Sequence, residues 1–252
     1  KIHDLLTDKN LLIMYLSAFL QKFLMILTFV CVSFALIHHF LLDEDELWLI
    51  YTPSAIIGTL AMGPASIFAQ KKGQFKAVML FGICAFVLSY FLMAYAVKES
   101  EKWLILLMMI VFFMGFAVLE PIMQSLASRY PKAHQKGAAL GIFTTLGYVG
   151  SALGGMCGGW LYEAVGVFSL SLIVAVICII WAILLILFLS NPKNHKNVYL
   201  KLEGNIASRL NKLDTLQGII EWYINQNEHI AIIKYDATLI QEAAILWVFK
   251  GA

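Results

Sequence analysis

Six long apolar stretches separated by short polar segments make up most of the chain. An α-helix rises about 1.5 Å per residue, so about 20 apolar residues can cross a bilayer core about 30 Å thick. Each stretch is about that long or longer. The pattern therefore predicts an all-α polytopic membrane unit over residues 1–192. Its six transmembrane helices are expected at 11–37, 47–69, 77–97, 103–127, 138–162 and 167–190.

The last part of the chain, residues 197–252, has a different pattern. Its apolar residues alternate as in strands or recur at helical spacing, and Asp236 is a candidate cap for the last helix. The elements expected are strands at 198–204, 219–225 and 229–236, and helices at 205–217 and from Ala237 onward. The order βαββα predicts a small α+β ferredoxin-like domain without its last strand, unless residues 247–250 supply it.

Basic residues gather on one side of the predicted membrane. Ten Lys and Arg residues lie at the termini and loops of that side, whereas only Lys98 and Lys102 lie on the other. Cytoplasmic loops carry an excess of these residues, so both termini are expected in the cytoplasm. This predicts a multi-pass protein of the cytoplasmic (inner) membrane.

Composition narrows the class of function. Apolar residues make up 61% of the chain and charged residues 13%, far from the balance of a soluble domain. The net charge of +2 does not indicate a nucleic-acid partner. No nucleophile–base pair, phosphate loop or set of metal ligands is recognised, and the four cysteines lie in apolar stretches without CxxC spacing. We therefore expect neither an enzyme nor a cofactor.

Two charged residues lie inside the apolar stretches. Glu120, followed by Pro121, lies roughly 10 Å from the cytoplasmic end of the fourth stretch, and Lys22, next to Gln21, lies roughly 18 Å into the first. Charges within a membrane are rare and usually face protein or water, so both are candidates for a substrate or proton pathway. The alternatives are a direct ion pair, separate water-filled faces, a partner for Lys22 outside this chain, and a Glu120 that snorkels to water.

The fifth stretch is rich in small residues at four-residue spacing. They form two stripes, Gly150, Gly154 and Gly158, and Gly147, Ser151, Gly155 and Gly159. Small residues at this spacing let helix backbones approach closely. The face is expected either to pack statically or to slide against another bundle of helices.

Several motifs resemble helices 10 and 11 of major facilitator superfamily efflux transporters. They are Leu119-Glu120-Pro121, SLASR at 125–129, KGAALG at 136–141, Gly154-Gly155 and Gly158-Gly159-Trp160-Leu161. The resemblance covers all six stretches, which would be helices 7–12 of a twelve-helix fold. A ferredoxin-like domain after the last helix makes the chain most similar to the YajR-type branch. The resemblance implies proton-coupled export of a small amphipathic or drug-like solute.

The resemblance also implies places for individual residues. The first and fourth stretches would line a central cavity, with Glu120, Lys22 and Gln21 as its polar groups. The aromatic lining implied is Tyr15, Phe19, Phe112 and Phe116.

Two further segments depart from the patterns they resemble. The loop with Lys71, Gly73 and Lys76 corresponds to a family loop signature but lacks its first glycine and its acid. We expect it to act as a basic topogenic segment. The tail resembles small copper-chaperone domains, but its loop at 203–208 contains no cysteine, so we expect no soft-metal site.

Two alternative functions remain open. The chain begins with Lys1 and has six of twelve expected helices, as a fragment or a processed product would. It would then be an inactive or split half-transporter that needs an N-terminal six-helix partner. The other alternative is a membrane-anchored sensor that is read through the C-terminal domain.

Overall fold

A computed structural model describes residues 2–190, 195–201, 210, 213, 216–225, 229–236 and 239–250. The chain divides into two compact units, Lys1–Asn191 and Pro192–Ala252. Each unit has its own cluster of buried apolar side chains.

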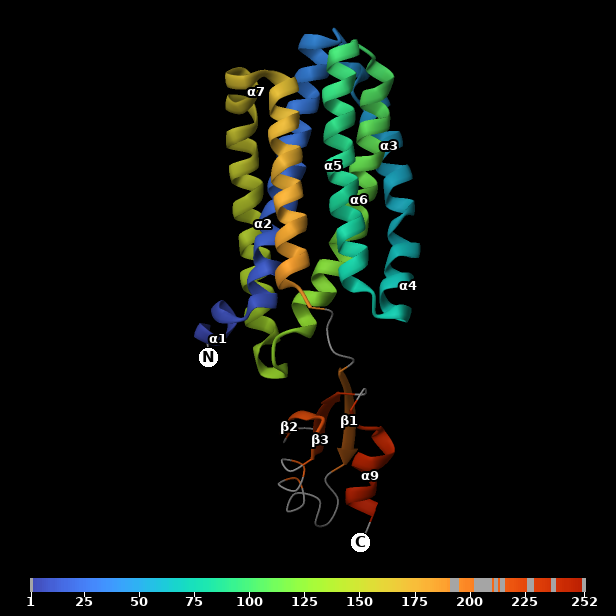
Figure 1. The fold of residues 1–252 in the computed structure, drawn as a ribbon, viewed down its shortest axis with the longest axis vertical. Helices are drawn as coiled ribbons and strands as arrows, with labels where there is room; N and C mark the ends of the chain where they lie inside the picture. Colours follow the sequence, from blue (N-terminus) through green and yellow to red (C-terminus); the bar gives the residue numbers. More distant parts are fainter. Residues whose placement is uncertain are drawn as a thin grey trace. The chain divides into compact units, whose positions relative to one another are not determined.

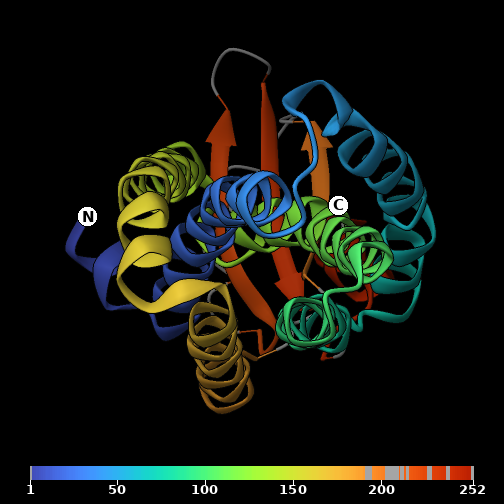
Figure 2. The ribbon, with the colours of Figure 1, turned by 90° about the horizontal axis from the view of Figure 1, so that it is seen from above.

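The first unit is a bundle of helices (Figures 1 and 2). Its α-helices are α1 (Ile2–Thr7), α2 (Lys9–Phe34), α3 (Trp48–Leu60), α4 (Met62–Lys72), α5 (Phe75–Glu99), α6 (Lys102–Arg129) and α7 (Lys136–Phe188). Among the described residues, five helical segments are long and apolar enough to cross a membrane. They are Lys9–His39, Glu44–Ala69, Phe75–Glu99, Lys102–Arg129 and Lys136–Phe188. The first four correspond to the first four predicted stretches.

Helix α7 contains both the fifth and the sixth predicted stretch. Gly166 lies within it with φ of 73° and ψ of 162°, a conformation that only glycine adopts readily. The helix reverses direction at this residue, as the yellow and orange segments in Figure 1 show. A turn at one glycine therefore takes the place of the polar loop expected at 163–166.

The second predicted stretch is interrupted near its middle. Helix α3 ends at Leu60 and α4 begins at Met62, with Ala61 between them. Pro64 lies in the first turn of α4, where its missing N–H removes no helical hydrogen bond. Helix α4 ends at Lys72 and is followed by Gly73, whose φ of 63° allows the sharp turn into α5.

Helices α2 and α7 pack closely through glycines. Gly147, Gly150, Gly154 and Gly158 are buried. A Cβ at Gly150 or Gly154 would collide with the carbonyl oxygen of Phe19 or Phe23 on α2. In the second predicted stripe, Gly147 is also buried, whereas Ser151, Gly155 and Gly159 are only half-buried. Its glycines face α2 at ordinary van der Waals distances, so the first stripe makes the closest contact and the second lies at its edge.

Large aromatic side chains fill the centre of the bundle. Phe86 of α5 stacks on Phe112 of α6 with ring centroids 4.8 Å apart. The indole Nε1 of Trp181 on α7 donates to the hydroxyl of Ser17 on α2 over 2.9 Å. These contacts connect α2, α5, α6 and α7 around one core, which holds the helices that carry the candidate site.

The second unit contains a three-stranded sheet. Its strands are β1 (His195–Lys201), β2 (Ile219–Asn225) and β3 (Ile230–Asp236), in the order β1-β3-β2, with β3 antiparallel to both neighbours. Val198, Ile233 and Tyr235 pack with Leu213 and Ile245 in its core. The three strands lie close to the positions predicted for them.

The end of the chain differs from the prediction. Helix α9 spans Glu242–Lys250, so it begins five residues after the expected start at Ala237, and residues 247–250 are helical and not a strand. The carbonyl oxygen of Asp236 accepts hydrogen bonds from the backbone N–H groups of Leu239 and Ile240, which forms a turn before the helix. The loop at 203–208 and most of the predicted helix at 205–217 lie outside the described residues.

Candidate functional site

Lys22 and Glu120 form an ion pair between two long helices. The ammonium Nζ of Lys22 on α2 lies 3.0 Å from Oε2 and 3.2 Å from Oε1 of Glu120 on α6. The two side chains remain 32% and 27% exposed. Of the arrangements left open by the sequence, the structure has the direct ion pair. The length of the lysine side chain bridges the difference in depth expected from the helical rise.

Neighbouring polar groups hold both partners in place. The amide of Gln124, one turn after Glu120, donates to Oε1 over 3.1 Å. Nζ of Lys22 lies 5.0 Å from the ring centre of Phe116, within the range of a cation–π interaction. The amide of the buried Gln21 lies 3.5 Å from the carbonyl oxygen of Phe116, at the outer limit of a hydrogen bond. The carboxylate therefore has two donors, and the ammonium has a carboxylate and an aromatic face.

The ion pair faces a small cavity. Its volume is about 160 Å³, and it lies between α2, α6 and the first half of α7. It is lined by Ala18, Gln21, Lys22, Glu120, Gln124, Phe143, Thr144, Gly147 and Tyr148. Charged, amide and hydroxyl groups thus meet in one space within an otherwise apolar bundle. Such a space can hold water or a polar ligand group, because each finds several hydrogen-bond partners there.

Three of the four aromatic residues implied as cavity lining lie elsewhere. Tyr15 is 3% exposed, and its hydroxyl makes no hydrogen bond within the described residues. Phe112 is fully buried against Phe86 and Tyr90. Phe19 stacks on Phe23, and its backbone packs against Gly150. Of these four residues, Phe116 lies beside the ion pair, and Tyr15, Phe19 and Phe112 are not part of the lining of this cavity.

The site also includes residues that the sequence did not single out. Gln124 is the most important of them, because it bonds directly to Glu120. Its spacing of four residues from a membrane-embedded acid could have identified it, since such residues share a helix face. Phe143 and Ala18 carry no comparable signal in the sequence.

The basic segment expected to be a loop, with Lys71, Gly73 and Lys76, consists of the end of α4, a short turn and the start of α5. Lys71 belongs to α4, and its side chain lies outside the described residues. Gly73 makes the turn with a positive φ, and the ammonium of Lys76 donates to the carbonyl oxygen of Ile186 over 2.7 Å. The described part of this segment therefore makes a turn and a contact with the end of α7.

Comparison with known proteins identifies a family. Residues 11–234 match the model of the Major Facilitator Superfamily. The chain is 26% identical over 214 residues to the inner membrane transport protein YajR of Escherichia coli K12, which covers 82% of this chain and 46% of that protein. It is 25% identical over 186 residues to an uncharacterized transporter of Buchnera aphidicola subsp. Baizongia pistaciae. This match covers 73% of the present chain and 47% of that transporter. The chain thus spans about half the length of these curated relatives.

Proposed function

Because the chain belongs to the Major Facilitator Superfamily, we propose that it is part of a secondary active transporter that exports a small amphipathic or drug-like solute in exchange for protons. The family consists of multi-pass membrane transporters, which favours a role in transport over enzymatic catalysis. The outward direction of transport, the class of solute and the exchange for protons are what we propose beyond family membership. The inner membrane is the proposed location, supported by the printed name of the relative from Escherichia coli.

The proposed topology has six membrane spans and cytoplasmic termini. The reversal of α7 at Gly166 supports two spans in that helix, and the excess of basic residues at one end of the helices supports the orientation. The tail would be a cytoplasmic ferredoxin-like domain with a regulatory or stabilising role. The strand order β1-β3-β2 supports this fold. Strands β1 and β2 run parallel to each other with the antiparallel β3 between them, as in a split βαβ unit.

The Lys22–Glu120 ion pair is the observation that carries the proposal. Protonation of Glu120 removes its negative charge, and Lys22 then lacks a counter-ion within the cavity. The lysine either seeks an anionic or polar group of the solute or moves toward water. Uptake of a proton and rearrangement of the cavity are thereby coupled at one pair of side chains.

Replacement of the carboxylate tests the coupling. Glu120→Gln keeps the shape of the side chain and removes its titration. We expect export of the amphipathic cations ethidium and rhodamine 6G to fall about tenfold or more, the equivalent of at least about 1.4 kcal/mol, and to lose its pH dependence. Transport is measured in vesicles that contain the chain together with an N-terminal six-helix half. Glu163→Gln, an exposed acid on α7, is the matched control and leaves export unchanged.

Transport at the normal rate and with the normal pH dependence in Glu120→Gln would exclude a coupling role for this residue. The same vesicles test the half-transporter alternative, which the coverage of 46% and 47% favours. Vesicles with the chain alone are expected to show no export above background. Export by the chain alone would rule out the need for an N-terminal half.

A further inference from the structure

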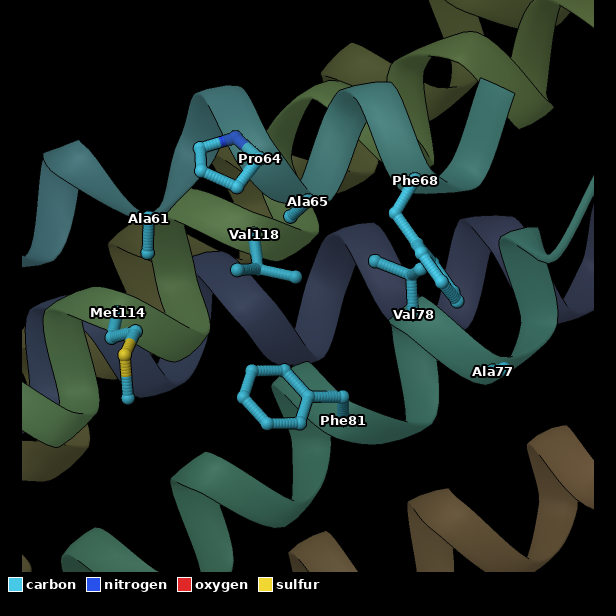
Figure 3. A pocket seen from close by; sticks show the side chains of 9 residues that line it. All are labelled: Ala61, Pro64, Ala65, Phe68, Ala77, Val78, Phe81, Met114 and Val118. Atoms are coloured by element: carbon cyan, nitrogen blue, oxygen red, sulfur yellow. The ribbon is translucent and has the colours of Figure 1, made fainter. Parts of the chain in front are cut away.

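A second and larger cavity lies on another side of the first unit. Its volume is about 400 Å³, and it lies between α4, α5 and α6. Figure 3 shows its lining, Ala61, Pro64, Ala65, Phe68, Ala77, Val78, Phe81, Met114 and Val118. None of these side chains carries a charge or a hydrogen-bonding group. The cavity is therefore suited to an apolar occupant, since water would find no partners on its walls.

The backbone explains why this space exists. The break between α3 and α4 at Ala61 separates the course of α4 from that of α3. Alanines at 61, 65 and 77 leave the gap between α4 and α5 unfilled. Phe81 and Phe68 at its edge are 55% and 44% exposed, so the space is open to the surroundings of the bundle. Where no other protein segment covers this face, those surroundings in a membrane are acyl chains.

Basic residues follow closely along the chain on one wall of the cavity. Ala77 and Val78 in its wall belong to the start of α5, directly after Phe75 and Lys76. The guanidinium of Arg129, from the end of α6, lies 4.8 Å from the ring centre of Phe75. Lys71 and Lys72 end helix α4 beside the same turn. The apolar lining on α5 is thus separated by less than one helical turn from Phe75, which contacts the guanidinium of Arg129.

Arg129 is free to bind an external anion. It is exposed, and its Nε donates to the hydroxyl of Ser125 over 3.1 Å. Within the described residues its terminal amino groups have no hydrogen-bond partner. An arginine keeps further N–H donors in a planar fork that matches the oxygens of a phosphate.

We propose that this cavity is a binding site for an anionic phospholipid, whose acyl chain lies between α4 and α5 and whose phosphate binds Arg129. The apolar lining accounts for the chain, and the basic end accounts for the charge of the headgroup. Basic residues at the cytoplasmic ends of membrane helices are known to select anionic lipids. The site is separate from the Lys22–Glu120 cavity, so it does not depend on the proposed transport reaction.

Lipid retention tests the headgroup contact. The chain is reconstituted in vesicles of equal amounts of phosphatidylglycerol and phosphatidylcholine, extracted in mild detergent, and its bound lipids are counted by native mass spectrometry. We expect phosphatidylglycerol to be enriched on the unchanged chain, and Arg129→Gln to lower the enrichment about fivefold. Arg129→Lys keeps a cation and retains most of the preference. The exposed Lys132 lies three residues further on, and Lys132→Gln leaves the preference unchanged.

A second variant tests the acyl-chain contact. Ala77 is exposed at the wall of the cavity, so Ala77→Leu fills the space without disturbing the core and lowers retention of both lipids at least about twofold. Ala152→Leu places the same change at an exposed site on α7 and has no such effect. Unchanged retention in Ala77→Leu, or equal loss of selectivity in Arg129→Gln and Lys132→Gln, would overturn the proposal.

Discussion

Lys22 and Glu120 depend on each other more than most surface ion pairs do. Each lies inside a helix whose other residues are mainly apolar, and each side chain is about two-thirds buried. Exposed pairs contribute little, because water competes for both charges. Removing one partner here leaves the other charge desolvated with only part of its hydrogen bonding.

We therefore expect a measurable interaction energy between the two residues. Lys22→Gln and Glu120→Gln are each expected to lower the free energy of unfolding by about 1–2 kcal/mol. The double variant loses less than the sum, with an interaction of about 0.5–2 kcal/mol. Denaturant unfolding in detergent micelles, followed by tryptophan fluorescence, measures all three. The exposed Lys98→Gln is the control, and additive losses in the double variant would contradict the expected interaction.

The sequence identified this site through its charges but not through its aromatic residues. A charge in an apolar stretch usually faces protein or water, so two such charges of opposite sign made direct pairing one of the arrangements expected. Phe112 and Phe116 are equally apolar, so the two differ only in the direction in which each side chain points from the axis of α6. Phe116 precedes Glu120 by four residues, which is nearly the same face, whereas Phe112 is rotated by about 80° and packs in the core. The neighbours that decide such a direction come from distant parts of the chain.

At the scale of elements, small residues determine how closely α2 and α7 approach. The carbonyl oxygen of Phe23 occupies the space that a Cβ at Gly154 would need. A Cβ at Gly159 would instead lie 3.6 Å from the ring of Phe34, an ordinary van der Waals distance. Gly154 therefore has no room for a side chain, whereas Gly159 has room for a methyl group.

This difference predicts opposite results for the same substitution. Gly154→Ala is expected to separate the helices and to lower the stability by about 1–3 kcal/mol. Gly159→Ala fits the available space and is expected to be neutral or slightly stabilising, because alanine favours the helix. Thermal unfolding of the two variants, side by side in the same detergent, gives the comparison. A melting temperature for Gly154→Ala equal to that of Gly159→Ala would show that this contact does not limit the packing.

Element positions were predictable where composition changes sharply. Apolar stretches and strand alternation placed the long helices and all three strands near their observed positions. That the turn uses Gly166 alone was not predictable, because glycine is common in the first half of α7 and only the backbone conformation distinguishes this one. The start of α9 was misplaced because Asp236 looks like a helix cap, whereas its carbonyl group forms a separate turn.

At the scale of the whole molecule, the two units have separate cores. The first is held by contacts among α2, α5, α6 and α7, and the second by the sheet and α9. Units with their own cores are expected to fold without each other. The end of α7 is also held within the helical unit, since the hydroxyl of Tyr130, directly after α6, donates to the carbonyl oxygen of Ser190 over 2.6 Å.

Removal of residues 192–252 is therefore expected to leave the helical unit intact. The truncated chain keeps Tyr130 and Ser190, and its thermal unfolding, measured by circular dichroism, should match that of the helical transition in the full chain. The same truncation also distinguishes the transporter hypothesis from the hypothesis that the chain is a membrane-anchored sensor. Loss of a ligand response with transport preserved would favour a sensor role for the tail, whereas a lower melting temperature would show that the tail stabilises the helices.

The ion pair between α2 and α6 also has a consequence during biosynthesis. Glu120 follows Lys22 by 98 residues, and ribosomes add about 5–20 residues per second. For about 5–20 s the nascent chain therefore contains Lys22 while its partner Glu120 has not yet been synthesised. Because an unpaired charge is costly in lipid, Lys22 is expected to stay in the aqueous interior of the insertion machinery, or to bind a lipid phosphate, during that interval. Release of the first helix into lipid is therefore expected to wait for the fourth.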